Sequence, residues 1–115
     1  MPEYRLAVYP GDGIGPEVTA EAVRTLEAAA ARFGFSLRLT DIPWGIEHWE
    51  RTGKLVPDDF LDQLRPHDAI LLGALGWPAK LPDHLTLAPL VKIRQAFDQY
   101  ACLRPAKLYP GVRGP

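Results

Sequence analysis

The sequence of 115 residues lacks the features that would place it in several large classes of protein. Its single cysteine, Cys102, excludes an internal disulfide and a cysteine-based zinc site. No apolar run approaches the roughly 18 residues that a membrane-spanning helix needs. The formal net charge is −1 without a block of like charges, so nothing indicates binding to nucleic acid or to a membrane surface. No internal repeat or low-complexity tract is present.

These absences leave a small molecule as the expected partner. Cys102 lies among apolar residues, where we expect an ordinary packed thiol in a reducing compartment. The first residues reach Gly11 and Asp12 before any apolar segment of signal-peptide length, so we expect a cytoplasmic protein. The chain is small for an enzyme with two substrates and ends in loop-like residues 111–115, so we expect it to be part of a longer protein.

The segment Tyr9–Val18 is the most informative part of the chain. It places glycines at positions 11, 13 and 15, between a predicted strand over 5–9 and a predicted helix over 16–33. Glycine lets bare backbone approach a ligand, and a helix N-terminus offers N–H groups to anions. The third glycine comes one residue too early for the dinucleotide-binding fingerprint. A tight strand-to-helix turn without a ligand therefore stays open as an alternative.

The rest of the chain alternates between strand and helix patterns. We expect a strand over 36–42, short helices over 45–52 and 57–64, a strand over 69–76, a helix begun or broken near Pro89, and an extended segment over 100–109. The continuous apolar run of 69–76 is typical of a strand covered by helices on both faces, inside a parallel sheet. This order predicts an α/β fold, part of a doubly wound and mainly parallel sheet.

Two arginines flank the turn after the last predicted helix. Arg94 and Arg104 would form a clamp for a di- or tricarboxylate if they converge, because guanidinium groups bind carboxylates through paired donors. The alternative is that Arg94 pairs with Asp98 one helical turn later, while Arg104 lies on the surface.

Three motifs in one order carry a resemblance to a known family. They are Pro-Gly-Asp-Gly-Ile-Gly-Pro-Glu-Val at 10–18, Leu-Gly-Ala-Leu-Gly at 72–76, and Ile-Arg-Gln at 93–95 with Leu-Arg-Pro at 103–105. From Tyr4 to Val112 the chain resembles the isocitrate/isopropylmalate dehydrogenase family. Phe97–Tyr100 and Pro82–His84 are most similar to its tartrate and D-malate dehydrogenase branch.

The resemblance implies a homodimeric oxidoreductase that oxidises a 2-hydroxy dicarboxylate with NAD and then releases carbon dioxide, assisted by Mg²⁺ or Mn²⁺. It implies that Arg94 and Arg104 bind substrate. It implies that the cofactor-binding side of the site includes Ile14, Gly73, Ala74 and Thr86. It implies no catalytic residue and no metal ligand within these 115 residues. Residues 1–99 would belong to a large cofactor-binding domain, and 100–115 would begin a second domain.

Other readings of the sequence remain open. The apolar stretch Leu87–Val91 would suit the alkyl group of 3-isopropylmalate, isocitrate-type specificity is a further possibility, and a non-catalytic anion-binding module is another. For several remaining polar and aromatic residues we expect a structural role and no part in catalysis or ligand binding. We expect Asp12 to brace the glycine turn, the histidines to bind no zinc, the tryptophans to pack, and Asp58 and Asp59 to start a helix.

Overall fold

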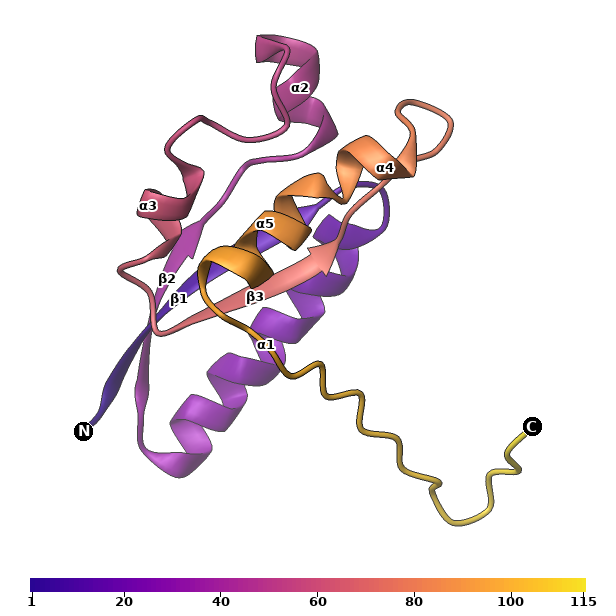
Figure 1. The fold of residues 1–115 in the computed structure, drawn as a ribbon. Helices are drawn as coiled ribbons and strands as arrows, with labels where there is room; N and C mark the ends of the chain where they lie inside the picture. The colour runs from indigo at the N-terminus through magenta and orange to yellow at the C-terminus, as the bar shows by residue number, and fades with distance from the viewer.

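The centre of the molecule is a three-stranded parallel sheet. The computed structural model describes residues 1–115, and its strands lie in the order β2-β1-β3 (Figure 1). The middle strand β1 (Glu3–Gly11) pairs with β2 (Ser36–Asp41) and with β3 (Ala69–Ala74). Helix α1 (Gly15–Phe33) covers one face, while α3 (Phe60–Leu64) and α5 (Ala88–Ala96) lie over the other. The α/β fold class with a parallel sheet is confirmed.

Helix α1 begins and ends where the sequence predicts. Pro16 occupies its first turn, where a missing N–H costs no helical hydrogen bond. Gly34 ends the helix in the left-handed region at φ 73°, and its N–H bonds to the carbonyl of Ala30 at 3.0 Å. The chain then turns back into β2, which runs parallel to β1 beside it.

The short helices differ in length from their predictions. Helix α2 (Ile46–Thr52) ends at Gly53 as expected. Helix α3 begins at Phe60 rather than at Pro57, because residues 57–59 form a turn in which the Phe60 N–H bonds to the Pro57 carbonyl at 3.2 Å. The predicted break near Pro89 separates α4 (Asp83–Thr86) from α5 at Leu87, with Pro89 in the first turn of α5.

The hydrophobic core lies between the sheet and the α3–α5 side. Its aromatic centre is Tyr9, which meets Trp44 edge-on at 5.7 Å between ring centroids, and Trp44 in turn meets Phe60 at 6.1 Å. The other buried members of this cluster are Ala7, Ile42, Leu64 and Ile93. Edge-on aromatic pairs of this kind stabilise a core beyond the area that they bury. The expected packing role of Trp44 is therefore confirmed.

Strand β3 lies at an edge of this sheet, which corrects the expectation that it belongs inside. Only β1 pairs with it, so its outer edge is open in this chain, and the strand stops at Ala74 instead of continuing to Gly76. The apolar run does reflect cover on both faces, since α1 packs on one side and Ile70 and Leu72 face the core on the other. The pattern of apolar side chains indicates which faces of a strand are covered. It does not indicate which strands lie beside it, because strand pairing depends on backbone hydrogen bonds.

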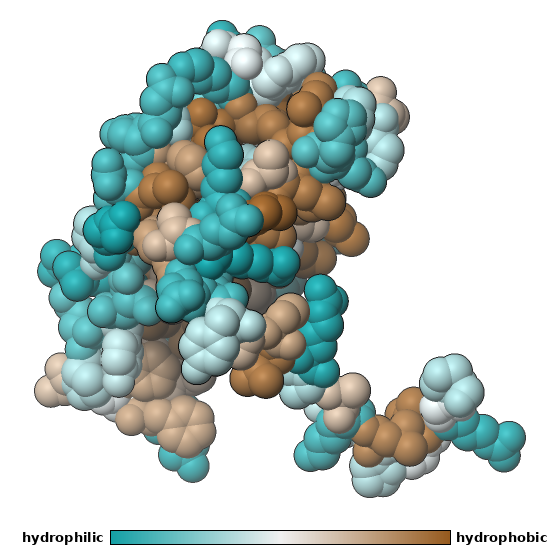
Figure 2. All heavy atoms as spheres, in the orientation of Figure 1, coloured by the Kyte–Doolittle hydropathy of each residue, from teal (hydrophilic) through white to brown (hydrophobic).

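The final residues run away from the body of the molecule (Figure 1). Residues 100–115 form neither helix nor strand, so the extended segment expected at 100–109 pairs with nothing in this chain. Its apolar side chains stand in the open (Figure 2); Tyr100 is 94% exposed and Leu103 is 88% exposed. Cys102 is exposed as well, so the expectation of a packed thiol is wrong within this chain. No helix of the structure is both long and apolar enough to cross a bilayer.

Candidate functional site

The glycine turn is a tightly packed joint between β1, α1 and the end of β3. The Asp12 N–H bonds to the Ala74 carbonyl at 2.6 Å, and the Gly15 N–H bonds to the Asp12 carbonyl at 2.8 Å. A Cβ at Gly11 or at Gly15 would collide with backbone atoms of Ala74 or Pro10. These two glycines therefore allow close packing inside the protein. At these positions the motif acts as a tight strand-to-helix turn without a ligand.

Gly13 differs from its neighbours. It has φ 56°, which favours glycine, yet the space beside it is open, with only the Gly76 carbonyl oxygen at 4.0 Å from a built Cβ. Gly13 also lines a cavity. Of the three glycines in the turn, only this one has open space where a Cβ would lie.

The carboxylate of Asp12 joins three loops at this end of the sheet. One oxygen accepts a hydrogen bond from the Ile46 N–H at 2.7 Å, and the other accepts one from the Gly76 N–H at 2.8 Å. Asp12 is only 6% exposed, so both bonds are shielded from water. The expectation that Asp12 braces the turn is confirmed. Sequence reasoning missed its partners, which lie 34 and 64 residues away.

A cavity of about 250 Å³ opens beside this joint, at the carboxyl end of the sheet. In parallel α/β sheets this is the end at which ligands bind. Its lining is Gly11, Asp12, Gly13, Pro16, Ile46, Glu47, Glu50, Trp77 and Lys80. Three carboxylates and one ammonium face it, so the cavity favours a neutral or positively charged group over a phosphate.

The loop between β3 and α4 forms one wall of the cavity. Lys80 binds the Glu50 carboxylate of α2 at 2.9 Å and lies over the Trp77 ring at 4.9 Å from its centroid. Both partners of this ion pair are about two-fifths exposed, which limits its strength. The sequence carried no signal for this pair, because its members lie 30 residues apart and on different elements.

The four residues expected on the cofactor side lie around this end of the sheet without sharing one cavity. Ile14 is 62% exposed just before α1. Gly73 and Ala74 end β3, and a Cβ at Gly73 would collide with Pro10 and Thr19. Thr86 is 2% exposed, and its hydroxyl donates to the Asp83 carbonyl at 3.3 Å instead of facing solvent.

The two candidate substrate arginines lie apart from the glycine turn. Helix α5 runs back alongside β3 (Figure 1), so Arg94 in its last turn lies near the beginning of that strand. Arg94 lines a hollow of about 420 Å³ with Ile70, Leu72 and Leu90. Arg104 is exposed in the final segment and lines no cavity. Neither guanidinium forms an ion pair, and the alternative pairing of Arg94 with Asp98 does not occur.

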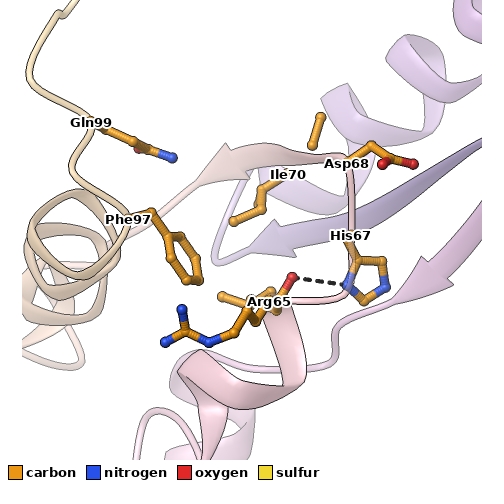
Figure 3. Close-up of a pocket in the computed structure, with 8 residues that line it drawn as sticks. Arg65, His67, Asp68, Ile70, Phe97 and Gln99 are labelled. Carbon is orange, nitrogen blue, oxygen red and sulfur yellow. Dashed lines mark hydrogen bonds between the residues drawn. The ribbon is translucent and has the colours of Figure 1, made fainter.

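A neighbouring hollow shows how this end of the sheet is built (Figure 3). Arg65 lies over the ring of Phe97, with 5.5 Å from its guanidinium carbon to the ring centroid. The Nδ1 atom of His67 lies 3.1 Å from the Leu64 carbonyl oxygen. The Arg65–Phe97 contact holds the end of α5 against the turn that precedes β3, and the His67 contact lies within that turn.

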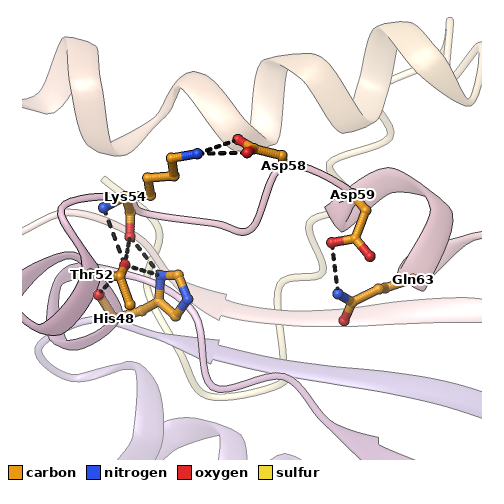
Figure 4. Close-up of polar contacts among 6 residues, drawn as sticks. All are labelled: His48, Thr52, Lys54, Asp58, Asp59 and Gln63. Atoms are coloured by element: carbon orange, nitrogen blue, oxygen red, sulfur yellow. Dashed lines mark hydrogen bonds and ion pairs between the residues drawn. The ribbon is translucent and has the colours of Figure 1, made fainter.

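Two of the three histidines, His48 and His67, contact nearby backbone carbonyl groups. His48 Nδ1 lies 2.5 Å from the Lys54 carbonyl oxygen and 3.3 Å from the Thr52 hydroxyl, in the turn after α2 (Figure 4). In the same region Lys54 binds Asp58, and Gln63 donates to Asp59 (Figure 4). Asp59 is the residue before α3 but caps no helix N–H with its side chain, and Asp58 lies in the turn before it, so the expected helix start is found only at Asp59. No three His, Cys, Asp or Glu side chains come together in a group that could hold a metal ion.

Comparison with known proteins identifies a family. The profile of "Isocitrate/isopropylmalate dehydrogenase" matches residues 5–114. The chain is 49% identical to D-malate dehydrogenase (decarboxylating) of Escherichia coli, covering 100% of this chain and 32% of that protein. It is 47% identical to tartrate dehydrogenase/decarboxylase of Pseudomonas putida, covering 95% and 30%, and 48% identical to 3-isopropylmalate dehydrogenase of Thermobifida fusca, covering 96% and 31%.

The chain thus spans about a third of the length of these relatives. Among solved structures it matches the β-decarboxylating dehydrogenase of Thermococcus kodakarensis in its apo form. That match has a TM-score of 0.59 at 34% identity and covers 83% of this chain and 27% of the other. The parallel sheet, the glycine turn and the profile match over nearly the whole sequence agree, and the chain belongs to the isocitrate/isopropylmalate dehydrogenase family.

Proposed function

We propose that this chain is the amino-terminal part of an NAD-dependent, divalent-metal-dependent enzyme that oxidatively decarboxylates a 2-hydroxy dicarboxylate of the D-malate or tartrate type. The observation that carries the proposal is the 49% identity to a D-malate dehydrogenase along the whole chain. Tartrate dehydrogenases at 45–47% identity support the same branch. In this scheme residues 1–99 belong to the cofactor-binding domain and 100–115 begin the second domain, as part of a homodimer.

The cavity beside the glycine turn fits one end of the proposed cofactor. Its carboxylates suit the positively charged nicotinamide ring of NAD⁺ better than a pyrophosphate, and the bare backbone of Gly13 allows close approach. Ile14 would line the nicotinamide side of the complete site, while Gly73 and Ala74 lie beside the glycine turn at the end of β3, outside the lining of this cavity. Thr86 would need to release its bond to Asp83 before it could reach a ligand.

Arg94 and Arg104 are proposed to hold the carboxylates of the substrate. Both guanidinium groups are free of ion pairs, so neither must give up an acidic partner to do so. When bound, NAD⁺ accepts the hydride and a divalent cation polarises the reacting oxygen. The arginines then keep in place the carboxylate that is retained. The metal ligands and the acid/base pair would come from parts of the protein beyond these residues.

Specificity for 3-isopropylmalate is an alternative with its own support. The 3-isopropylmalate dehydrogenase of Thermobifida fusca is 48% identical, almost as similar as the D-malate enzyme. In addition, the hollow beside Arg94 is lined by Leu72, Leu90 and Ile93, which would suit an alkyl substituent. Isocitrate-type specificity and a non-catalytic anion-binding module are further candidates.

Steady-state turnover of the complete protein decides between these functions. The assay uses NAD⁺, Mn²⁺ and a panel of D-malate, tartrate, 3-isopropylmalate and isocitrate. We expect the highest kcat/KM with D-malate or tartrate. A preference for 3-isopropylmalate or isocitrate would transfer the protein to that branch, and no turnover with any of the four would favour the binding module.

A further inference from the structure

We propose that Asp12 is a positioning residue for the cofactor side of the site, a role that rests on the proposed function. Its carboxylate ties the glycine turn to the start of α2 and to the loop after β3. These three segments are also the walls of the cavity at the carboxyl end of the sheet. Asp12 therefore sets the spacing of the walls between which the nicotinamide end of NAD would enter.

Every polar group of Asp12 is used to join segments. The backbone N–H bonds to Ala74, the backbone carbonyl accepts from Gly15, and the two side-chain oxygens accept from Ile46 and Gly76. Both side-chain oxygens are occupied by amide donors, which argues against a role as a proton acceptor. The carboxylate acts through the geometry that it holds and not by contact with the reacting atoms.

The space around the Asp12 carboxylate depends on nearby glycines. Gly45 has φ 129°, and a Cβ there would collide with an oxygen of Asp12. Gly76 has φ 108°, and a Cβ there would crowd Asp83 and Thr86 at 3.2 and 3.3 Å. Gly45 thus leaves room for the buried carboxylate, whereas Gly76 leaves room for Asp83 and Thr86.

An asparagine cannot replace this carboxylate. Its amide offers one acceptor oxygen, and its NH₂ group would face one of the two N–H donors. A carboxylate that accepts two shielded N–H bonds also makes stronger hydrogen bonds than a neutral acceptor. The Asp12→Asn variant therefore frees either the α2 wall or the β3–α4 wall of the cavity.

The ion pair of Lys54 with Asp58 supplies a control outside the cavity. It lies between α2 and α3, and its side chains are 56% and 84% exposed, whereas Asp12 is 6% exposed. Exposed pairs contribute little because water and salt screen them. We therefore expect the same substitution, Asp58→Asn, to have a small effect where Asp12→Asn has a large one.

The test uses the complete protein with D12N, D58N and G45A. Hydrogen exchange at the Ile46 and Gly76 amides reports the joint itself, fluorescence titration with NADH reports cofactor affinity, and steady-state kinetics separate the KM for NAD⁺ from that for the hydroxy acid. We expect D12N to lose amide protection and to weaken NADH binding roughly 10- to 100-fold, as removal of a group that orients a site does. The KM of D12N for the hydroxy acid, and the NADH affinity and both KM values of D58N, should stay within about twofold of those of the unmodified protein.

Unchanged NADH affinity in D12N, or an equal loss in both KM values, would overturn the positioning role. Should D12N fail to fold, G45A answers the same question, since it keeps Asp12 but displaces its carboxylate; weaker NADH binding supports the role and unchanged binding refutes it. If the unmodified protein binds NADH normally but turns over no hydroxy acid, only the proposed function is refuted. The amide protection and the NADH titrations would still test the positioning role of Asp12.

Discussion

The hydroxyl of Thr19 lies where a side chain on Gly73 would have to begin. Thr19 is 4% exposed in α1, and its hydroxyl has no hydrogen-bond partner. Gly73, one residue before the end of β3, brings strand and helix into close contact at this point. The contact positions the glycine turn, because α1 starts directly after that turn.

The contact between Thr19 and Gly73 predicts that substitutions at these two residues have different effects on the free energy of unfolding. Gly73→Ala should destabilise the protein by about 1–3 kcal/mol, because a methyl group is forced into a filled space. Thr19→Val should be neutral or stabilising, because it removes a buried hydroxyl that bonds to nothing while it keeps the shape. Thermal and urea unfolding of the complete protein measure both, and a clear loss of stability in Thr19→Val would mean that the hydroxyl has a partner.

Replacement of Arg94 tests the proposed substrate site. Loss of a charged hydrogen-bond donor costs about 1.5–3 kcal/mol, so Arg94→Ala should lower kcat/KM for the hydroxy acid roughly 10- to 100-fold. The KM for NAD⁺ should change little. Lys92→Ala is the matched control, because Lys92 is an exposed cation on the same helix and lines a different hollow. Equal kinetics for Arg94→Ala and Lys92→Ala would remove Arg94 from the site.

The core tyrosine predicts a loss of stability at alkaline pH. Burial raises the pKa of Tyr9 above its usual value of 10.0, and the nearby Asp12 carboxylate raises it further. Below pH 10 both the folded and unfolded states keep the phenol protonated, so stability is unaffected. Above pH 10 only the unfolded state releases the proton, so this residue lowers the free energy of unfolding by about 1.4 kcal/mol per pH unit until its folded-state pKa is reached.

Tyr9→Phe isolates that effect. The urea midpoint of the unmodified protein should fall more steeply between pH 9 and pH 11 than that of the variant. Tyrosinate absorbance should show no contribution from Tyr9 in the folded protein over the same range. Parallel stability curves for the two proteins would show that Tyr9 ionises as freely in the folded state as in the unfolded one.

The isolated chain of residues 1–115 is expected to associate. Both outer edges of its sheet are unpaired, at β2 and at β3, and unpaired edges are templates for contact with other chains. Its last 16 residues also expose Tyr100, Leu103 and Leu108. Size-exclusion chromatography with light scattering should detect oligomers or aggregates. A monodisperse monomer with a cooperative thermal transition would contradict this expectation.

Local signals in the sequence predicted most of the elements. The limits of α1 follow from Pro16 and Gly34, because a proline in the first turn and a left-handed glycine at the end act within a few residues. The start of α3 was less accurate, because Pro57 and the two aspartates suit a turn as well as a helix start. The extended segment expected over 100–109 forms no β-strand in this chain, since a strand needs a neighbouring strand that supplies hydrogen bonds.

The candidate site was only partly predictable. The glycine turn was identified correctly as the joint before α1, yet two of its three glycines serve packing against Pro10 and Ala74. The lining of the adjacent cavity by Glu50 and Lys80 could not be predicted, since it depends on α2 meeting the β3–α4 loop. Arg94 and Arg104 remain predictions based on their motifs, because motif spacing does not reveal which cavity a side chain lines.

The sequence by itself determined the order of strands and helices, the turn between β1 and α1, and membership of the dehydrogenase family, because helix caps, apolar periodicity and motifs are encoded within short segments. Only the tertiary structure decided that Asp12 binds Ile46 and Gly76, that β3 lies at an edge, and that Arg94 lies at the opposite end of β3 from the glycine turn. Those relationships join residues tens of positions apart, and they arise only when helices pack on both faces of the sheet and bring the loops at its ends together.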